Sequence, residues 1–249
     1  MANSGKEGLG LRITGIYDNY SSSDEMVPGW GFSVLLELAG KKFLFDTGAD
    51  VAILAQNMEE LGVKPKELET VILSHPHCDH VGGLSAVLKR NSNLSVVLTE
   101  SFPDPLKKKI VNYGADLVTI SDCQQISEGL LSTGEMDGRY RDIWVPEQSL
   151  FVNTRRGPVV IAGCAHPGID NVVERAIMIT GESPYLVLGG FHLGGASPEK
   201  VQDIIEKFKV NGIQKVAPSH CTGKRAEEAL KKEYGEDFID FGAGKVVTV

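Results

Sequence analysis

The feature of this chain that most constrains its fold is the alternation of short apolar segments with segments of helical period. Nine segments have the length and the Val, Ile and Leu content of β-strands, at 11–16, 32–38, 42–46, 70–74, 95–99, 116–120, 158–163, 185–190 and 213–218. Helical periodicity is present at 51–62, 84–90, 171–180, 198–208 and 224–235. Strands come first, then strands and helices alternate, and a last apolar run, KVVTV, returns to a strand.

Helices with a single apolar face need a sheet to pack on. Two sheets packed face to face, with helices outside, bury every apolar surface in this order of elements. We therefore predict an α/β (α+β) fold, a four-layer αββα sandwich in a single domain spanning 1–249. The segment around 100–150 fits least, because it combines Pro103, Pro105, several glycines and Trp144 in a polar context. We predict that it is a lid or insertion over the sheet edges.

All six histidines closely follow apolar segments. Three lie in SHPHCDH, at 74–80, and the others end the sequences VVIAGCAH, YLVLGGFH and KVAPSH, at His166, His192 and His220. Asp46 has the same kind of position in KFLFDTG. A lone histidine at a strand end is more often a capped or solvated side chain than a ligand. Six together predict a shared metal site, because strand ends of one sense gather at one sheet edge and imidazole is the commonest metal ligand near neutral pH.

The spacing within SHPHCDH indicates two ions. His75 and His77 are two residues apart, so in an extended segment both side chains point the same way and can reach one ion. Asp79 and His80 are adjacent and can face a second direction in a turning loop. Six histidines and Asp79 exceed what one tetrahedral zinc can use. We predict two divalent ions, zinc first, with manganese and iron compatible with the same ligands.

These residues, with the glycines at 82 and 83, resemble the metallo-β-lactamase superfamily. The resemblance runs from Asp46 to His220 in order and spacing, and implies a single metallo-β-lactamase-like domain with a dinuclear site. It implies that one ion is held by His75, His77 and His166, and the other by Asp79, His80 and His220. It further implies that Asp46 orients a ligand imidazole through a hydrogen bond.

One position departs from the superfamily pattern. Hydrolases of the superfamily have an aspartate that bridges the two metals, on the strand between those of His166 and His220. Here that strand ends Gly189-Gly190-Phe191-His192, so the metal pair would be held only by solvent, or one site would be weaker. His192 is predicted either to donate a proton or contact substrate, or to support the site structurally. Asp79 is a second catalytic candidate, since it could accept a hydrogen bond from the attacking nucleophile.

The sequences GCAHPGIDN, GGFHL and PSHCTG resemble one subgroup of the superfamily. It is named for a 7,8-dihydropterin-6-methyl-4-(β-D-ribofuranosyl)aminobenzene-5'-phosphate synthase. The superfamily resemblance implies a hydrolase of a small molecule that uses a metal-bound hydroxide at the dinuclear site. The subgroup resemblance implies the alternative, a metal-dependent synthase or transferase acting on a dihydropterin or a phosphorylated precursor. A metal-binding module without catalytic activity is a third hypothesis.

Three cysteines flank the predicted ligands. Thiolate is a good zinc ligand, but Cys78 lies between two ligands in an extended run and should point away from them. We predict that Cys78, Cys164 and Cys221 are small packing residues. A nucleophilic pair of Cys164 and His166 is the alternative, and it would remove a metal ligand.

Two pairs of residues are anion-binding candidates. Thr222 and Lys224 open a predicted helix, whose free N–H groups could take a phosphate or form an ordinary N-cap. Arg139 and Arg141, near Trp144, fit either a planar anionic substrate or a solvated lid.

Charge narrows the class of partner. The net charge of −8 argues against nucleic acid as a partner, because binding to a phosphate backbone needs a cationic face.

The amino-terminal sequence MANSGKEGLG lacks the apolar core of a secretory signal, and no apolar run approaches the length of a membrane span. Four cysteines without a CxxC pair fit reduced thiols. We expect a cytoplasmic protein with a small-molecule substrate that could carry a phosphate, without a nucleic-acid or membrane partner. The sequence does not indicate the oligomeric state.

Overall fold

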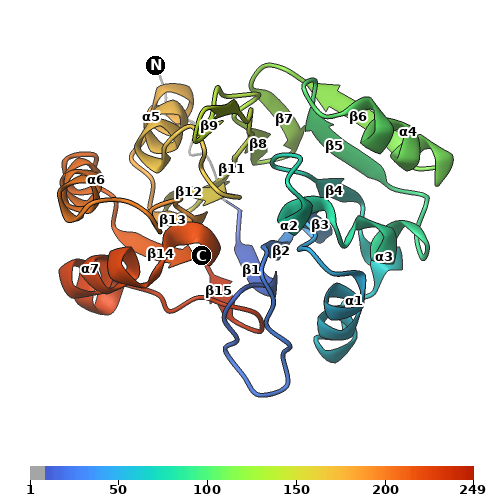
Figure 1. The fold of residues 1–249 in the computed structure, drawn as a ribbon, viewed down its shortest axis with the longest axis horizontal. Helices are drawn as coiled ribbons and strands as arrows, with labels where there is room; N and C mark the ends of the chain where they lie inside the picture. Colours follow the sequence, from blue (N-terminus) through green and yellow to red (C-terminus); the bar gives the residue numbers. More distant parts are fainter. Residues whose placement is uncertain (1–8) are drawn as a thin grey trace.

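Two β-sheets pack face to face between two layers of helices (Figure 1). The computed structural model describes residues 9–249, so nearly all of the segment in which we expected no secretory signal lies outside the described residues. The first sheet has seven strands, in the spatial order β15 (Val246–Thr248), β1 (Leu11–Tyr17), β2 (Ser33–Leu38), β3 (Lys41–Phe45), β4 (Thr70–Ile72), β5 (Ser95–Thr99) and β6 (Asp116–Ile120). The second has six, in the order β14 (Lys215–Ser219), β13 (Leu186–Gly190), β12 (Gly157–Ala162), β11 (Leu150–Thr154), β8 (Leu130–Ser132) and β7 (Gln124–Ser127).

The helices divide between the two outer faces. α1 (Val51–Glu60), α3 (Leu84–Leu88) and α4 (Asp104–Asn112) cover the first sheet, and α5 (Ile169–Thr180), α6 (Pro198–Val210) and α7 (Lys224–Tyr234) cover the second. The short helix α2 (Cys78–Val81) and the 3-10 turns η1 (Pro65–Glu67), η2 (His220–Thr222) and η3 (Gly235–Asp237) lie in connections. Among residues 9–249, no helix combines the length and the apolar character that crossing a bilayer requires.

The buried side chains form three layers that match this architecture. The central layer lies between the sheets and includes Phe43, Phe45 and Val152. A second layer joins the first sheet to α1, α3 and α4, and a third joins the other sheet to α5, α6 and α7. Strands with apolar residues on both faces need cover on both sides, which the αββα order provides. The predicted fold class is confirmed.

Parallel pairing brings the carboxyl ends of neighbouring strands to the same edge of a sheet. β3, β4, β5 and β6 are parallel to one another, as are β12, β13 and β14. In register, Phe45 pairs with Ile72, and Gly190 pairs with Ser219. The residues that follow these strands therefore emerge side by side at one edge of each sheet, as the positions of the histidines predicted.

The segment 100–150 contains more regular structure than the sequence indicated. α4 and β6 complete the first sheet and its cover, and β7 and β8 form the edge of the second sheet. α4, β7, β8 and the following strand β11 were not predicted as elements. The prolines of α4 fall at its start, where a missing backbone N–H costs nothing. Only the hairpin of β9 (Arg139–Tyr140) and β10 (Ile143–Trp144) forms a separate two-stranded sheet in the described part of this segment.

Candidate metal centre

Two triads of potential ligands gather where the strands end. His75, His77 and His166 form the first triad, and Asp79, His80 and His220 form the second; within each triad the potential ligand atoms lie within 4.8 Å of one another. These are the two ligand sets that the superfamily resemblance implied. In the second triad, His80 Nε2 lies 3.2 Å from His220 Nε2. The triads adjoin, since the ring centroids of His75 and His80 are 4.1 Å apart.

The donor atoms of the triads fit a divalent cation. His75 Nε2 is buried and has no hydrogen-bond partner within residues 9–249. An unsatisfied buried polar atom costs about 1–3 kcal/mol of folding stability. Burial and the neighbouring His80 lower the pKa of His75 well below its ordinary value, and burial and His166 lower the pKa of His77. Neutral imidazoles with unused lone pairs, together with the Asp79 carboxylate, are the ligand set that Zn²⁺ and similar ions take.

Asp46 orients His80 from beneath the site. Its carboxylate is fully buried and accepts hydrogen bonds from the Ser74 backbone N–H and hydroxyl, both at 2.7 Å. Asp46 Oδ2 also lies 2.7 Å from His80 Nδ1. The other ring nitrogen, His80 Nε2, therefore faces the other ligands of the second triad. Burial opposes protonation of His80, but the Asp46 carboxylate outweighs it and raises the pKa of His80 to about 9. Ser74 Oγ is 2.9 Å from His75 Nδ1, so one polar network supports both triads.

Glu147 has the corresponding position behind the first triad, and it was not predicted from the sequence. It is buried and accepts hydrogen bonds from the backbone N–H groups of Cys164, Ala165 and His166 at 2.8–2.9 Å. Its Oε2 also lies 2.8 Å from His166 Nδ1. Burial alone would raise the pKa of Glu147, but the rings of His75 and His166 outweigh it and hold this pKa far below its ordinary range. The local sequence VPEQS has no pattern that marks a buried carboxylate.

The loop before β2 supports the second triad. Trp30 Nε1 donates to Asp79 Oδ2 at 2.8 Å. Asn19 Oδ1 lies 3.0 Å from His220 Nδ1, and Asn19 Nδ2 donates to the His220 carbonyl at 2.8 Å. Neither supporting residue was predicted, because both come from a loop without periodicity.

Backbone strain is concentrated at the same strand ends. Six non-glycine residues among 9–249 have a positive φ, and four of them lie at the site: Asp46, Ala165, His192 and His220. Such conformations cost about 1–3 kcal/mol each and persist where the surroundings impose them. The surrounding structure therefore holds the backbone at these strand ends in left-handed conformations.

His192, the other catalytic candidate, belongs to neither triad. Its ring centroid lies 4.6 Å from that of His166, and its nearest potential co-ligands are Cys164 and Cys221. The neighbouring Cys221 raises the pKa of His192. The anion-binding candidates Thr222 and Lys224 lie elsewhere. The Thr222 hydroxyl is buried, donates to the Ser219 carbonyl and accepts from the Phe191 N–H, and neither candidate belongs to the pocket lining formed by described residues.

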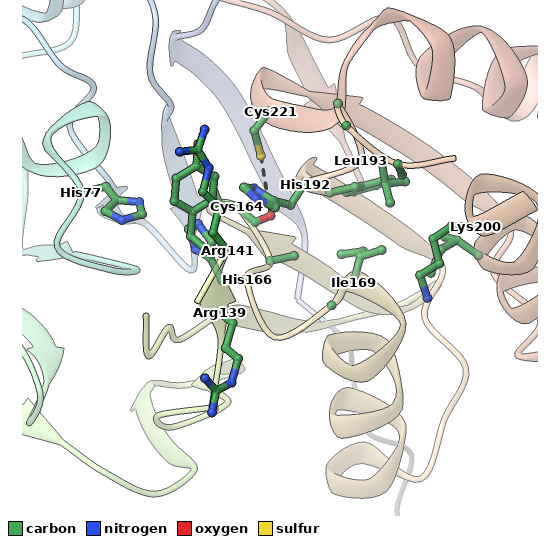
Figure 2. Close-up of a pocket in the computed structure, with 18 of the residues that line it drawn as sticks. His77, Arg139, Arg141, Cys164, His166, Ile169, His192, Leu193, Lys200 and Cys221 are labelled. Atoms are coloured by element: carbon green, nitrogen blue, oxygen red, sulfur yellow. Dashed lines mark hydrogen bonds between the residues drawn. The ribbon is translucent and has the colours of Figure 1, made fainter. Parts of the chain in front are cut away.

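A pocket of about 800 Å³ opens over the two triads. Figure 2 shows His77, His166 and His192 around this pocket, with Cys221 beside His192. Trp30 and Tyr140 add aromatic surface, and Arg139, Arg141 and Lys200 add positive charge. The hairpin β9–β10 thus contributes to the pocket wall.

Comparison with known proteins adds evidence on relationship. The sequence model of the metallo-beta-lactamase superfamily matches residues 27–177. The 7,8-dihydropterin-6-methyl-4-(beta-D-ribofuranosyl)-aminobenzene-5'-phosphate synthase of Methanocaldococcus jannaschii is 30% identical, over 93% of each chain. The solved structure of Tm1679, described as a metal-dependent hydrolase of the beta-lactamase superfamily, is 29% identical with a TM-score of 0.81, covering 96% of this chain and 99% of that one.

More distant structures agree in fold alone. The metallo-beta-lactamase fold protein YhfI from Bacillus subtilis is 14% identical, with a TM-score of 0.69 over 97% of this chain and 100% of that one. The αββα order, the ligand triads at the strand ends and the match over 27–177 all agree with the resemblance inferred from the sequence. The chain belongs to the metallo-β-lactamase superfamily.

Proposed function

We propose that this chain is a metal-dependent hydrolase of a small anionic molecule, with two divalent ions, zinc first, held by the two triads. The observation that carries the proposal is the adjacency of the triads at one pocket, together with the buried and unpartnered His75 Nε2 among the described atoms. When bound, the ions would polarise the scissile bond and lower the pKa of a shared water. Asp46 and Glu147 would orient the ligands and supply compensating negative charge from below.

The chain's own residues around the pocket would complete the chemistry. Asp79 belongs to the second triad and accepts a hydrogen bond from the Trp30 indole, and its carboxylate would orient a nucleophile there. His192 lines the pocket beside His166, from where it would pass a proton to the leaving group. The role of Asp79 concerns the geometry of the metal site, and the role of His192 concerns proton transfer. Variants of the two residues can therefore be tested separately.

The pocket wall favours a planar anionic substrate. The Tyr140 ring contacts those of His77 and His192 at centroid distances of 6.0 and 5.5 Å and offers a stacking surface. Arg139, Arg141 and Lys200 place positive charge on the same pocket in a chain whose net charge is −8. A small phosphorylated or carboxylated molecule fits this local charge better than an extended polyanion does.

A second candidate function is the synthase reaction. The similarity to the dihydropterin synthase over 93% of each chain favours it, and the aromatic and cationic pocket fits an aromatic phosphate equally well. In this case the enzyme would transfer the pterin group of a dihydropterin pyrophosphate to a ribofuranosyl-aminobenzene phosphate, with pyrophosphate as the leaving group, rather than add water to a bond.

The proposal is tested first by metal content. Protein purified without chelator should contain at least about two transition-metal ions per chain, two of them at the triads, and His77→Ala should lose metal from the first triad and lose activity. His192→Gln should keep the metal of both triads and lose kcat, because the residue belongs to neither triad. Protein without bound transition metal, or full activity in His77→Ala, would refute the assignment.

A substrate screen separates the two candidate functions. Metal-replete protein should be assayed with phosphodiesters, lactones, thioesters and phosphorylated aromatic esters, and in parallel with a dihydropterin pyrophosphate and a ribofuranosyl-aminobenzene phosphate. Hydrolysis of the first group supports the hydrolase. Product formation only from the second pair would select the synthase instead.

A further inference from the structure

Two cysteines and one histidine form a cluster in the pocket that neither triad uses. Cys164, His192 and Cys221 each offer one ligand atom, and these atoms lie within 4.8 Å of one another. We propose that this cluster is a third cation site, which binds one thiophilic divalent ion such as Zn²⁺ and is separate from the two triads. In protein that holds this ion, His192 is a ligand and replaces the proton-transfer role proposed above for it; the proposal does not depend on whether the enzyme hydrolyses or joins its substrates.

The chemistry of the three side chains suits such an ion. Zinc binds thiolate sulfur at about 2.3 Å and imidazole nitrogen at about 2.0–2.1 Å, in a tetrahedron whose sulfurs are about 3.8 Å apart. The three potential ligand atoms lie within 4.8 Å of one another, a spacing comparable to that tetrahedron. Soft thiolates select zinc and related ions over magnesium, calcium and manganese. Three protein ligands leave a fourth position, and all three side chains line the substrate pocket.

The fold brings the three residues together from neighbouring strands. Cys164 follows β12, His192 follows β13 and Cys221 follows β14, and these strands are parallel and adjacent. Gly190 makes room for the Cys221 sulfur, because a Cβ at this glycine would lie 2.6 Å from it. Figure 2 shows the Cys221 sulfur and the His192 ring side by side in the pocket.

His192 supplies an independent sign of a missing ligand. Its backbone has φ +52, a conformation that a non-glycine residue adopts only when its surroundings impose it. Its Nδ1 is buried and without a hydrogen-bond partner among the described residues. A packing histidine would be expected to satisfy this atom, whereas a ligand histidine would direct a free nitrogen at an ion.

Charge balance allows a third ion beside the other two. Two thiolates neutralise one divalent cation, so filling the cluster adds no net charge to the pocket. Cys164 Sγ lies 3.3 Å from His80 Nε2, so the cluster borders the second triad without sharing its three ligands. This differs from the prediction from sequence, in which Cys164 and Cys221 were packing residues.

Cobalt substitution tests the proposal directly, because Co²⁺ bound by thiolate has an intense near-ultraviolet charge-transfer band that nitrogen and oxygen ligands do not produce. Reduced, metal-free protein titrated with Co²⁺ should develop this band. Cys221→Ser should abolish it and lower the bound metal by one equivalent per chain. Cys78→Ser is the matched control, since Cys78 lines the same pocket but lies outside the cluster, and it should keep the band. Absence of the band in the unaltered protein, or its loss only in Cys78→Ser, would overturn the proposal.

A second measurement needs no variant. Reduced protein, stripped or loaded with Zn²⁺, is treated with iodoacetamide and its peptides are analysed by mass spectrometry. Zinc should slow alkylation of Cys221 at least tenfold and leave the exposed Cys78 unaffected. Equal alkylation of Cys221 in both states would show that its thiol is not a ligand. The outcome is independent of the dinuclear proposal, because His77→Ala should lose metal from the first triad and still show the cobalt band.

Discussion

The two ligand triads are supported by different parts of the molecule. Behind the first, the buried Glu147 orients His166 and also holds the backbone of its loop. Behind the second, Asp46 orients His80, but much of the remaining support comes from a loop whose Trp30 is 63% exposed. The first triad is thus tied to the stability of the core, whereas part of the support of the second lies in an exposed loop that can be altered with little effect on folding.

The largest effect is expected from Glu147→Gln. The amide keeps the shape of the carboxylate but turns one acceptor into a donor, which leaves buried N–H groups of residues 164–166 unpaired. Breaking a buried charged network of this kind costs about 3–5 kcal/mol. Urea unfolding should show this loss, and elemental analysis should show metal lost from the first triad before the second.

Glu135→Gln is the matched control for this change. Glu135 also accepts from a backbone N–H and a hydroxyl, those of Ser101, but it contacts no potential ligand. It should cost about 1 kcal/mol and leave metal content unchanged. If the two variants lost equal stability and equal metal, Glu147 would have no special connection to the first triad.

The next largest effect is expected from Asp46→Asn. Loss of the carboxylate behind a ligand histidine typically costs about 10–100-fold in metal affinity, and here His80 loses its 2.7 Å partner. Competition with a chromophoric chelator should show much weaker binding at the second triad and a smaller loss at the first, which Asp46 reaches only through Ser74. Asp50→Ala, which removes the N-cap of α1, should cost about 1 kcal/mol of stability and no metal affinity. Equal weakening of both triads would show that they act as one unit.

A smaller effect is expected from Trp30→Phe. The variant keeps an aromatic ring near His220 but removes the indole N–H that donates to Asp79. One hydrogen bond to a charged group at an exposed position is worth about 0.5–1.5 kcal/mol, so affinity at the second triad should fall about 2–10-fold. Trp144→Phe is the control, because its indole donates instead to Asp137. Titration calorimetry that found no difference between the two variants would show that the loop does not support the second triad.

The sequence predicted the parts of the site that local pattern determines. His75, His166 and His220 come shortly after apolar strands, and parallel pairing brings such positions to one edge. Glu147 and Asn19 could not be predicted in this way, because they reach the triads from connections whose course depends on tertiary packing. The helix α4 was missed for a related reason, since its prolines are typical of a loop as well as of a first helical turn.

The smallest effect is expected at Asp170, a carboxylate beside the pocket that orients no potential ligand. Its Oδ2 lies 2.8 Å from Lys207 Nζ and 3.5 Å from Lys200 Nζ. Burial would raise the pKa of Asp170, but the lysines outweigh it and lower this pKa. The folded-state pKa is therefore below the unfolded one. The contribution to stability is present above the ordinary carboxyl pKa of about 3.9 and is lost as the pH falls through the lowered value.

Asp170→Asn should accordingly lower the free energy of unfolding by less than about 1 kcal/mol at pH 7, because water screens lysines that are 40% and 48% exposed. In urea unfolding the variant and the unaltered protein should converge as the pH is lowered below the ordinary carboxyl pKa, and their metal contents at pH 7 should be equal. A loss as large as that of Glu147→Gln would mean that any carboxylate near the pocket stabilises the fold to the same degree. The contrast between the triads would then reflect proximity to the pocket rather than the hydrogen bonds that Glu147 and Asp46 make.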